Sequence, residues 1–199
     1  MNAADRSDDG RRTPRDPQPP RGDRQHRRAL RKLAAPVSVL TVCHDGQPHG
    51  TTVSTVTTCS HEPLLLGTYL RGGSAFAGLA SGAGRFVVNV LNASQADLAR
   101  YFADRSRPLG YPQFAGLSWS DDPYSGAPLL EGALAAYSCR LFGRSEVGDH
   151  ELLLGHVTHV SVGEGEPLLS YTGGLFAGPL SPAPISGPGP RTSMEKVAP

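Results

Sequence analysis

The stretch His49-Gly50-Thr51-Thr52-Val53-Ser54-Thr55-Val56-Thr57-Thr58-Cys59-Ser60 is the part of the chain from which the fold can be inferred. Its valines and threonines are β-branched and favour an extended backbone, in which successive side chains point to opposite faces. One face can pack while the other presents hydroxyl groups, an arrangement that suits a flat ligand with polar edges. A threonine-rich edge strand without any ligand is the alternative, because β-propensity alone explains threonine.

Strands are predicted on both sides of this stretch. Residues 37–42 form an apolar run, and Asp45-Gly46 is typical of a tight hairpin turn leading into residues 49–60 as one strand. Further strands are predicted at 63–69, 84–91, 133–142, 151–162 and 167–171, with a turn at 143–150. Short helices are predicted at 23–35, after Ser74, and after a capping box of Ser94 and Asp97. The pattern predicts a mainly β protein, a closed or nearly closed barrel with a few short flanking helices.

The chain of 199 residues is long enough for one domain with a substantial core. Residues 1–22 are rich in Asp, Arg and Pro, and residues 177–199 are rich in Pro, Gly and Ser. Neither segment can bury enough apolar surface to offset the entropy lost on ordering. We therefore predict a disordered basic head at 1–22, a folded domain at 23–176 and a disordered tail at 177–199.

Composition argues against several classes of protein. The net charge is only +1, and no basic face with interleaved aromatic residues predicts a nucleic-acid partner. No apolar run approaches the length of a membrane span, and the N-terminus lacks the apolar core of a signal peptide. The three cysteines, Cys43, Cys59 and Cys139, are odd in number and widely spaced, which indicates reduced thiols. We expect a cytoplasmic protein that associates with neither membranes nor nucleic acid.

Common motifs for nucleotides and metals are incomplete. Gly82-Ala83-Gly84 lacks the third glycine of a dinucleotide fingerprint, and Leu79 stands where a phosphate-binding loop needs lysine. His150 and His156 would lie about 20 Å apart on a strand, too far to share one metal ion, so we predict no metal site. Asp149-His150 could place an oriented imidazole beside a cavity, although a histidine in a surface turn is an equal alternative.

Short motifs follow one another along most of the chain. They are Pro48-His49-Gly50-Thr51-Thr52-Val53-Ser54-Thr55-Val56-Thr57-Thr58-Cys59-Ser60, Glu62-Pro63-Leu64, Ser74, Gly84-Arg85-Phe86-Val87-Val88-Asn89-Val90-Leu91, Gln95-Ala96-Asp97-Leu98-Ala99, Phe102-Ala103, Phe114-Ala115-Gly116-Leu117, Pro128-Leu129-Leu130, Gly148-Asp149-His150 and Pro167-Leu168-Leu169. In this order and spacing they resemble the short-chain flavin reductase family, FMN-binding split-barrel enzymes that supply reduced flavin to two-component monooxygenases. The resemblance covers about residues 28–176.

This resemblance implies a split β-barrel that forms homodimers and transfers hydride from NADH or NADPH to FMN, with FAD also possible. By the same resemblance Thr52, Val53, Ser54 and Thr55 lie along the isoalloxazine. Ser60 would follow on that wall, Ser74 would help to hold the phosphate, and His150 would contact the nicotinamide. Two alternatives remain: an oxidoreductase that keeps its flavin and acts on an organic substrate, and a non-catalytic flavin-binding protein.

Overall fold

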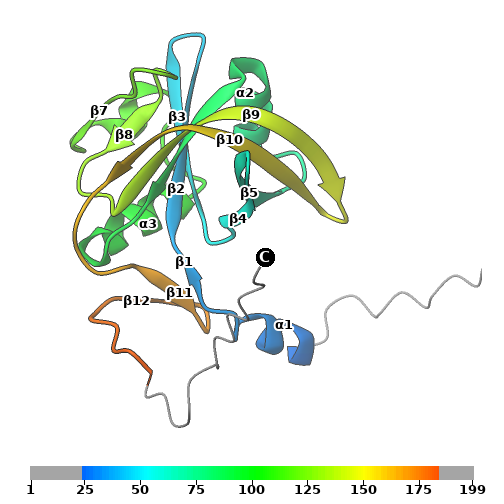
Figure 1. The fold of residues 1–199 in the computed structure, drawn as a ribbon, viewed down its shortest axis with the longest axis vertical. Coiled ribbons are helices and arrows are strands. Elements are labelled where there is room, and N and C mark those ends of the chain that lie inside the picture. The colour runs from blue at the N-terminus through cyan, green and yellow to red at the C-terminus, as the bar shows by residue number, and fades with distance from the viewer. Residues whose placement is uncertain (1–23, 184–199) are drawn as a thin grey trace, which may run out of the picture.

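The computed structural model describes residues 24–183, so the disorder predicted at 1–22 lies outside the described residues, as does the part of the predicted 177–199 tail from residue 184 onward. Its main element is a seven-stranded antiparallel sheet in the order β3-β2-β6-β9-β10-β5-β4 (Figure 1). The strands are β2 Ser38–His44, β3 Gln47–Val53, β4 Thr57–His61, β5 Leu64–Arg71, β6 Arg85–Val90, β9 Ala135–Val147 and β10 His150–Val162. The sheet curls but does not close, because β3 and β4 remain its two edges. The mainly β class is confirmed, with an open barrel in place of a closed one.

Smaller elements surround this sheet. The helices are α1 Arg24–Leu30, α2 Ala75–Ala83 and α3 Ala96–Ala103, with the 3-10 turns η1 Ala93–Gln95 and η2 Tyr111–Phe114. The short strands β7 Trp119–Asp121 and β8 Pro128–Leu130 form a two-stranded sheet. None of the helices described between residues 24 and 183 is both long and apolar enough to span a membrane.

The predicted hairpin between β2 and β3 is confirmed. Asp45 and Gly46 both have positive φ, 50° and 70°, as a two-residue turn with the twist of a β-hairpin requires. The register pairs His44 with Gln47 and continues to Ser38 opposite Val53. This turn therefore sets which side chains of β3 face the interior of the barrel.

The prediction of one continuous strand over residues 49–60 is wrong. β3 ends at Val53 and β4 begins at Thr57, and the two strands occupy opposite edges of the sheet. The link at 54–56 is fixed to β5 by Thr55, whose Oγ1 accepts the N–H of Tyr69 at 3.1 Å. Periodicity could not reveal this break, because threonine and valine continue through it without a glycine or proline.

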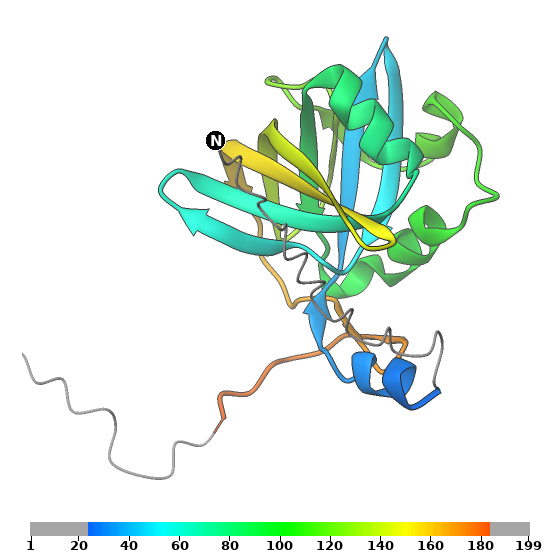
Figure 2. The same cartoon turned by 90° about the vertical axis from the view of Figure 1, so that its right-hand side faces the viewer.

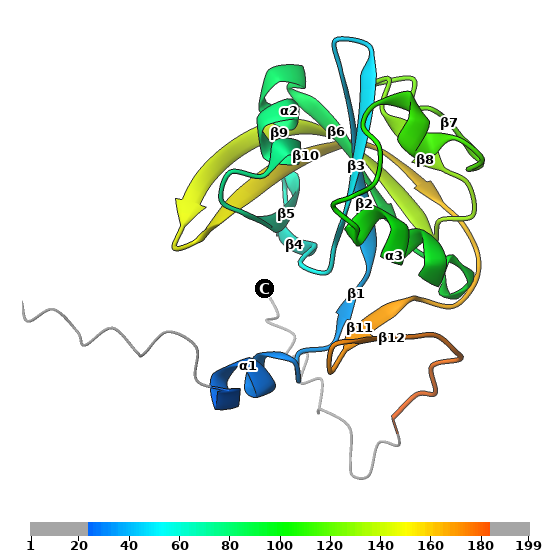
Figure 3. The same ribbon diagram turned by 180° about the vertical axis from the view of Figure 1, so that it is seen from behind.

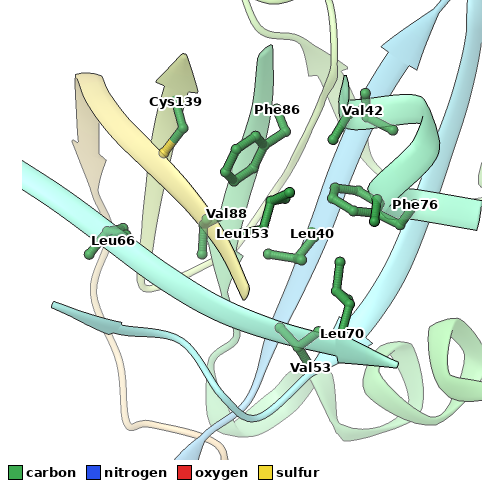
Figure 4. Packing of buried hydrophobic residues seen from close by; sticks show 12 residues of the cluster. Leu40, Val42, Val53, Leu66, Leu70, Phe76, Phe86, Val88, Cys139 and Leu153 are labelled. Atoms are coloured by element: carbon green, nitrogen blue, oxygen red, sulfur yellow. The ribbon is translucent and has the colours of Figure 1, made fainter. Parts of the chain in front are cut away.

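The core fills the inside of the curled sheet. Leu40 from β2, Val88 from β6 and Leu153 from β10 meet there, and Phe76 from α2 closes one end (Figure 4). A second cluster on the outer side of β2 and β3 includes Phe102 of α3 and is also buried. The sheet wall around β3 thus packs on both faces, which holds this edge strand rigidly.

Several boundaries differ from those predicted, and three of the differences are the largest. The turn between β9 and β10 is confined to Gly148 and Asp149, because β9 continues to Val147, through most of the predicted 143–150 turn, and β10 begins at His150. The capping box uses Asn92 and Gln95 in place of Ser94 and Asp97: Asn92 Oδ1 accepts the N–H of Ser94 at 2.7 Å. The first helix ends at Leu30 and contains no buried residue.

A separate small sheet joins the beginning and the end of the described chain. It consists of β1 Ala35–Pro36, β11 Leu169–Tyr171 and β12 Gly174–Phe176, paired in the order β1-β11-β12. Figure 2 and Figure 3 place it with α1 beyond one end of the large sheet. Residues 177–183 form no helix or strand.

Candidate functional site

A cavity of about 590 Å³ lies between the β3 edge, the turn after β5 and the loop after α3. Its volume falls within the range of cofactor sites in proteins. The lining residues are His49, Thr51, Thr52, Val53, Ser54, Thr55, Tyr69, Leu70, Arg71, Gly72, Gly73, Ser74, Ala75, Phe76, Phe102, Ala103, Arg105, Arg107 and Leu109. The cavity is therefore built by segments from three parts of the chain.

Most of the predicted site residues line this cavity. Thr52, Val53, Ser54 and Thr55 form one wall and Ser74 lies on the facing wall. Ser60 and His150 are not among the lining residues. Ser60 lies on β4 opposite Leu65, away from the wall formed by residues 52–55.

His150 begins β10 and stands directly opposite Arg71, which does line the cavity. Its Nδ1 lies 2.7 Å from Oδ1 of Asp149, and this hydrogen bond lowers the pKa of the exposed Asp149 carboxyl. The imidazole is thus oriented by its neighbour and stands near the rim of the cavity. It is a neighbour of the cavity in this structure and does not form part of its wall.

The hydroxyl groups of the β3 wall are partly engaged within the protein. Thr52 Oγ1 donates to the carbonyl of Ala99 in α3 at 2.8 Å. Thr55 Oγ1 lies 3.0 Å from both the Tyr69 carbonyl and the Thr68 hydroxyl. These two threonines hold the wall in place, so their hydroxyls are not free donors for a ligand.

The backbone of β3 offers donors and acceptors of its own. The Gly50 N–H donates to Oε1 of Gln113 at 2.9 Å, and Arg107 Nη2 donates to the Gly50 carbonyl, so both backbone groups of Gly50 point away from β2. Backbone groups alternate in direction along a strand, and those of Thr52 therefore also point out of the sheet edge. Because Thr52 lines the cavity, its N–H and carbonyl are available to a planar ligand there.

The facing wall is a glycine-containing turn that leads into α2. The Ser74 N–H donates to the carbonyl of Arg71 at 3.0 Å, and Gly73 has a φ of 74°, which favours glycine. Ser74 is the N-terminal cap of α2, but its side chain makes no capping hydrogen bond. A free hydroxyl and the first N–H groups of a nine-residue helix form a site that suits an anion.

Three arginines line the cavity and were not singled out from the sequence: Arg71, Arg105 and Arg107. Arg107 is fixed by a hydrogen bond to the Asp104 carbonyl at 2.5 Å and lies 5.8 Å from the centre of the Phe102 ring. Positive charge around a cavity attracts anionic ligands. No periodic pattern marks these residues in the sequence, because Arg105 and Arg107 lie in an irregular loop.

His49 also lines the cavity, and the sequence pattern predicts no role for it. Its side chain is buried, and its ring centre lies 6.4 Å from that of Phe76. Burial, assisted by the charge of Arg107, lowers the pKa of the imidazole. A neutral His49 therefore lines the cavity at pH 7, where it can both donate and accept a hydrogen bond. Within residues 24–183, no group of His, Cys, Asp and Glu side chains could hold a metal ion.

Proteins of known activity are similar to this chain in sequence. Residues 30–179 match the model of the flavin reductase like domain. The NADPH-flavin oxidoreductase of Streptomyces viridifaciens is 38% identical over 153 residues, covering 76% of this chain and 79% of that protein. The NADH-dependent FAD reductase of Streptomyces globisporus is 34% identical over 152 residues, covering 76% and 83%.

Solved structures agree with these sequence relatives. BorF, the flavin reductase component of a bacterial two-component tryptophan halogenase, superposes with a TM-score of 0.75 at 31% identity, covering 79% of this chain and 99% of that protein. An NADH:FAD oxidoreductase of Streptomyces globisporus C-1027, in complex with NAD and FAD fragments, gives a TM-score of 0.73 at 31% identity. That match covers 78% of this chain and 92% of the reductase.

Proposed function

The chain belongs to the flavin reductase like family, and on this premise we propose that it transfers hydride from a reduced nicotinamide to flavin. It is an NAD(P)H:flavin oxidoreductase whose reduced product supplies a partner monooxygenase, as reductase components among its relatives do. The observation that carries this function is the cavity between the β3 edge and the turn at 71–74, with one wall for a planar ring and one for an anion.

The residues present fit FMN. The outward backbone groups of Thr52, with Val53, Ser54 and Thr55 beside it, would hold the isoalloxazine, whose polar edge both donates and accepts. Ser74 and the N-terminus of α2 would bind the phosphate. Arg105 and Arg107 extend the positive surface around the cavity, which also leaves FAD as an acceptable flavin. Ser60 would act only indirectly, through β4.

The protein's part in the reaction is mainly to position two rings. When bound, flavin and nicotinamide supply the hydride chemistry themselves, so the chain needs no strong general base. The Thr52 N–H would stabilise charge that develops on the flavin edge. The His150 imidazole, oriented by Asp149, would contact the nicotinamide from the cavity rim. Neutral His49 adds a hydrogen-bonding side chain to the cavity without adding charge.

A homodimer is part of this proposal. Large apolar side chains are exposed outside the barrel core, among them Leu33 at 71%, Val162 at 83% and Phe176 at 49%. A second copy of the chain would remove apolar side chains of this kind from water. The protein is expected to be cytoplasmic, because that compartment supplies reduced nicotinamide and keeps thiols such as Cys43, Cys59 and Cys139 reduced. Sedimentation of the purified chain tests the dimer, with a concentration-independent monomer as the contrary result.

A simple assay tests the function. Purified protein is mixed with NADH or NADPH, excess FMN or FAD, and oxygen, and nicotinamide absorbance at 340 nm is followed. Turnover that rises with free flavin supports the reductase. Protein that retains its flavin and turns over only with an organic acceptor would support the bound-flavin oxidoreductase, and flavin binding without nicotinamide oxidation would support a non-catalytic binding protein.

A further inference from the structure

A buried carboxylate lies directly behind the turn at residues 71–74. The Glu151 side chain is only 4% exposed, and its Oε1 accepts the Gly73 N–H at 2.7 Å. Its Oε2 is contacted by Nε and Nη2 of Arg144, each at 2.5 Å. The carboxylate therefore joins the backbone of the turn to a guanidinium on β9.

The turn is also tied to the hairpin that carries Glu151. The Gly72 N–H donates to the Asp149 carbonyl at 3.0 Å, immediately before β10. Two successive N–H groups of the turn, those of Gly72 and Gly73, thus point to the β9–β10 hairpin. The Ser74 hydroxyl and the start of α2 are left for the cavity.

The charge of Glu151 creates an electrostatic problem for an anion site. A carboxylate that holds the Gly73 N–H from behind also repels a phosphate bound in front of the same turn. Arg144 compensates this charge, because its positive guanidinium binds Oε2 through two N–H groups. Nη1 of Arg144 lies 3.4 Å from the Ser81 hydroxyl of α2, which places it over the helix that begins at the turn.

We propose that Glu151 and Arg144 are positioning residues for phosphate recognition: Glu151 fixes the turn through Gly73, and Arg144 cancels the negative charge that this requires. The pair then determines how strongly the protein prefers a phosphorylated flavin over riboflavin, which has the same ring but no phosphate. This inference rests on the proposed function, in which the turn holds the flavin phosphate.

The test compares the dissociation constants of FMN and riboflavin, measured by quenching of flavin fluorescence. Arg144→Met leaves Glu151 uncompensated, so FMN binding should weaken about fivefold to tenfold while riboflavin binding changes less than twofold. Glu151→Gln keeps an oxygen that accepts the Gly73 N–H and removes the repulsion, so the preference for FMN should stay or increase. The double variant should restore the wild-type preference.

Two further variants serve as controls. Arg140→Met removes the same charge from an exposed position on the same strand and should leave both constants unchanged. Arg144→Lys retains the charge and should keep most of the preference for FMN over riboflavin. This variant keeps the proposal testable if circular dichroism shows that Arg144→Met does not fold. In that case a lost preference in Arg144→Lys, or in Glu151→Gln, overturns the proposal.

An ion pair with only a structural role gives a different pattern. Both single variants would then weaken FMN and riboflavin by the same factor, and that result would overturn the proposal. If the wild-type protein binds FMN no better than riboflavin, the phosphate site itself is wrongly assigned. If it binds FMN preferentially but oxidises no nicotinamide, the catalytic proposal fails while the role of this pair stands.

Discussion

The two walls of the cavity are built on opposite principles. The β3 wall is rich in hydroxyls, yet Thr52 and Thr55 direct theirs to Ala99 and to β5. The turn at 71–74 has one hydroxyl, that of Ser74, and this group makes no capping hydrogen bond. The side chains of the β3 wall stabilise the wall itself, and its backbone groups face the ligand. The turn at 71–74 is held by its backbone hydrogen bonds, and its Ser74 side chain faces the ligand.

This difference shows that the number of polar side chains in a sequence is a poor guide to the number of groups that face a ligand. A buried or half-buried hydroxyl is stabilised by an internal partner, and a wall that must stay in register requires such partners. Substitutions in the β3 wall should therefore change stability and binding together, and substitutions in the turn should change binding alone.

The largest effect is expected for Gly50→Ala on β3. A Cβ at this position would lie 2.5 Å from Cε1 of Phe102, so this buried ring must shift and the overpacking should cost about 2 kcal/mol of unfolding free energy. Urea denaturation measures this change. Gly78→Ala is the matched control, because its Cβ meets no atom within 4 Å and alanine should stabilise α2 by about 0.5 kcal/mol. Equal stability of the two variants would contradict the packing argument.

Thr55→Val removes the hydroxyl that fastens the 54–56 link to β5 while keeping the shape of the side chain. We expect a loss of about 1 kcal/mol in stability, and weaker binding of FMN and riboflavin by similar factors. Thr57→Val, at an exposed position on β4, is the control and should change neither quantity. Weaker FMN binding with unchanged stability would show that Thr55 contacts the ligand directly.

Ser74→Ala tests the other wall. FMN binding should weaken about fivefold, riboflavin binding should hold, and stability should stay within about 0.5 kcal/mol because the hydroxyl caps nothing. Fluorescence titration and urea denaturation of the same samples check both parts. Ser74→Thr retains the hydroxyl and should bind FMN nearly as well as the wild type. A large loss of stability in Ser74→Ala would contradict the expectation that substitutions in the turn change binding alone.

His150→Ala examines a residue that belongs to neither wall. The KM for the nicotinamide should rise about threefold while the dissociation constant of FMN is unchanged, as expected for an imidazole at the cavity rim. His61→Ala, an exposed histidine on β4, serves as the control in the same steady-state assay. Equal changes in both constants would remove His150 from the nicotinamide site.

The smallest effect concerns the pH dependence of stability. Burial and Arg107 hold the pKa of His49 below its unfolded value of about 6.5, so the unfolded state binds the proton more readily. The stability associated with His49 is complete above pH 6.5 and declines as the pH falls from there towards the folded pKa. His49→Gln should therefore lose less stability between pH 7 and 5 than the wild type, as measured by thermal unfolding. A steeper loss in the variant would contradict the assignment of a neutral His49.

The sequence predicted the fold better than the details of the site. Alternating strands and the Asp45-Gly46 turn are local signals, and both are found in the structure. The break at 54–56 depends on the tertiary contact between Thr55 and Tyr69 of β5, for which the local pattern carries no sign. Arg107 and Glu151 were missed for the same reason: their partners, Gly50 and Gly73, lie 57 and 78 residues away in the chain.

β3 and β5 share no hydrogen-bonded ladder, and the cavity lies between the edge of β3 and the end of β5. A ligand bound there would bridge strands that share no hydrogen-bonded ladder. Its release would therefore break none of the backbone pairing of the sheet. A protein that must release its ligand in every catalytic cycle can then bind and release it repeatedly while its fold remains intact.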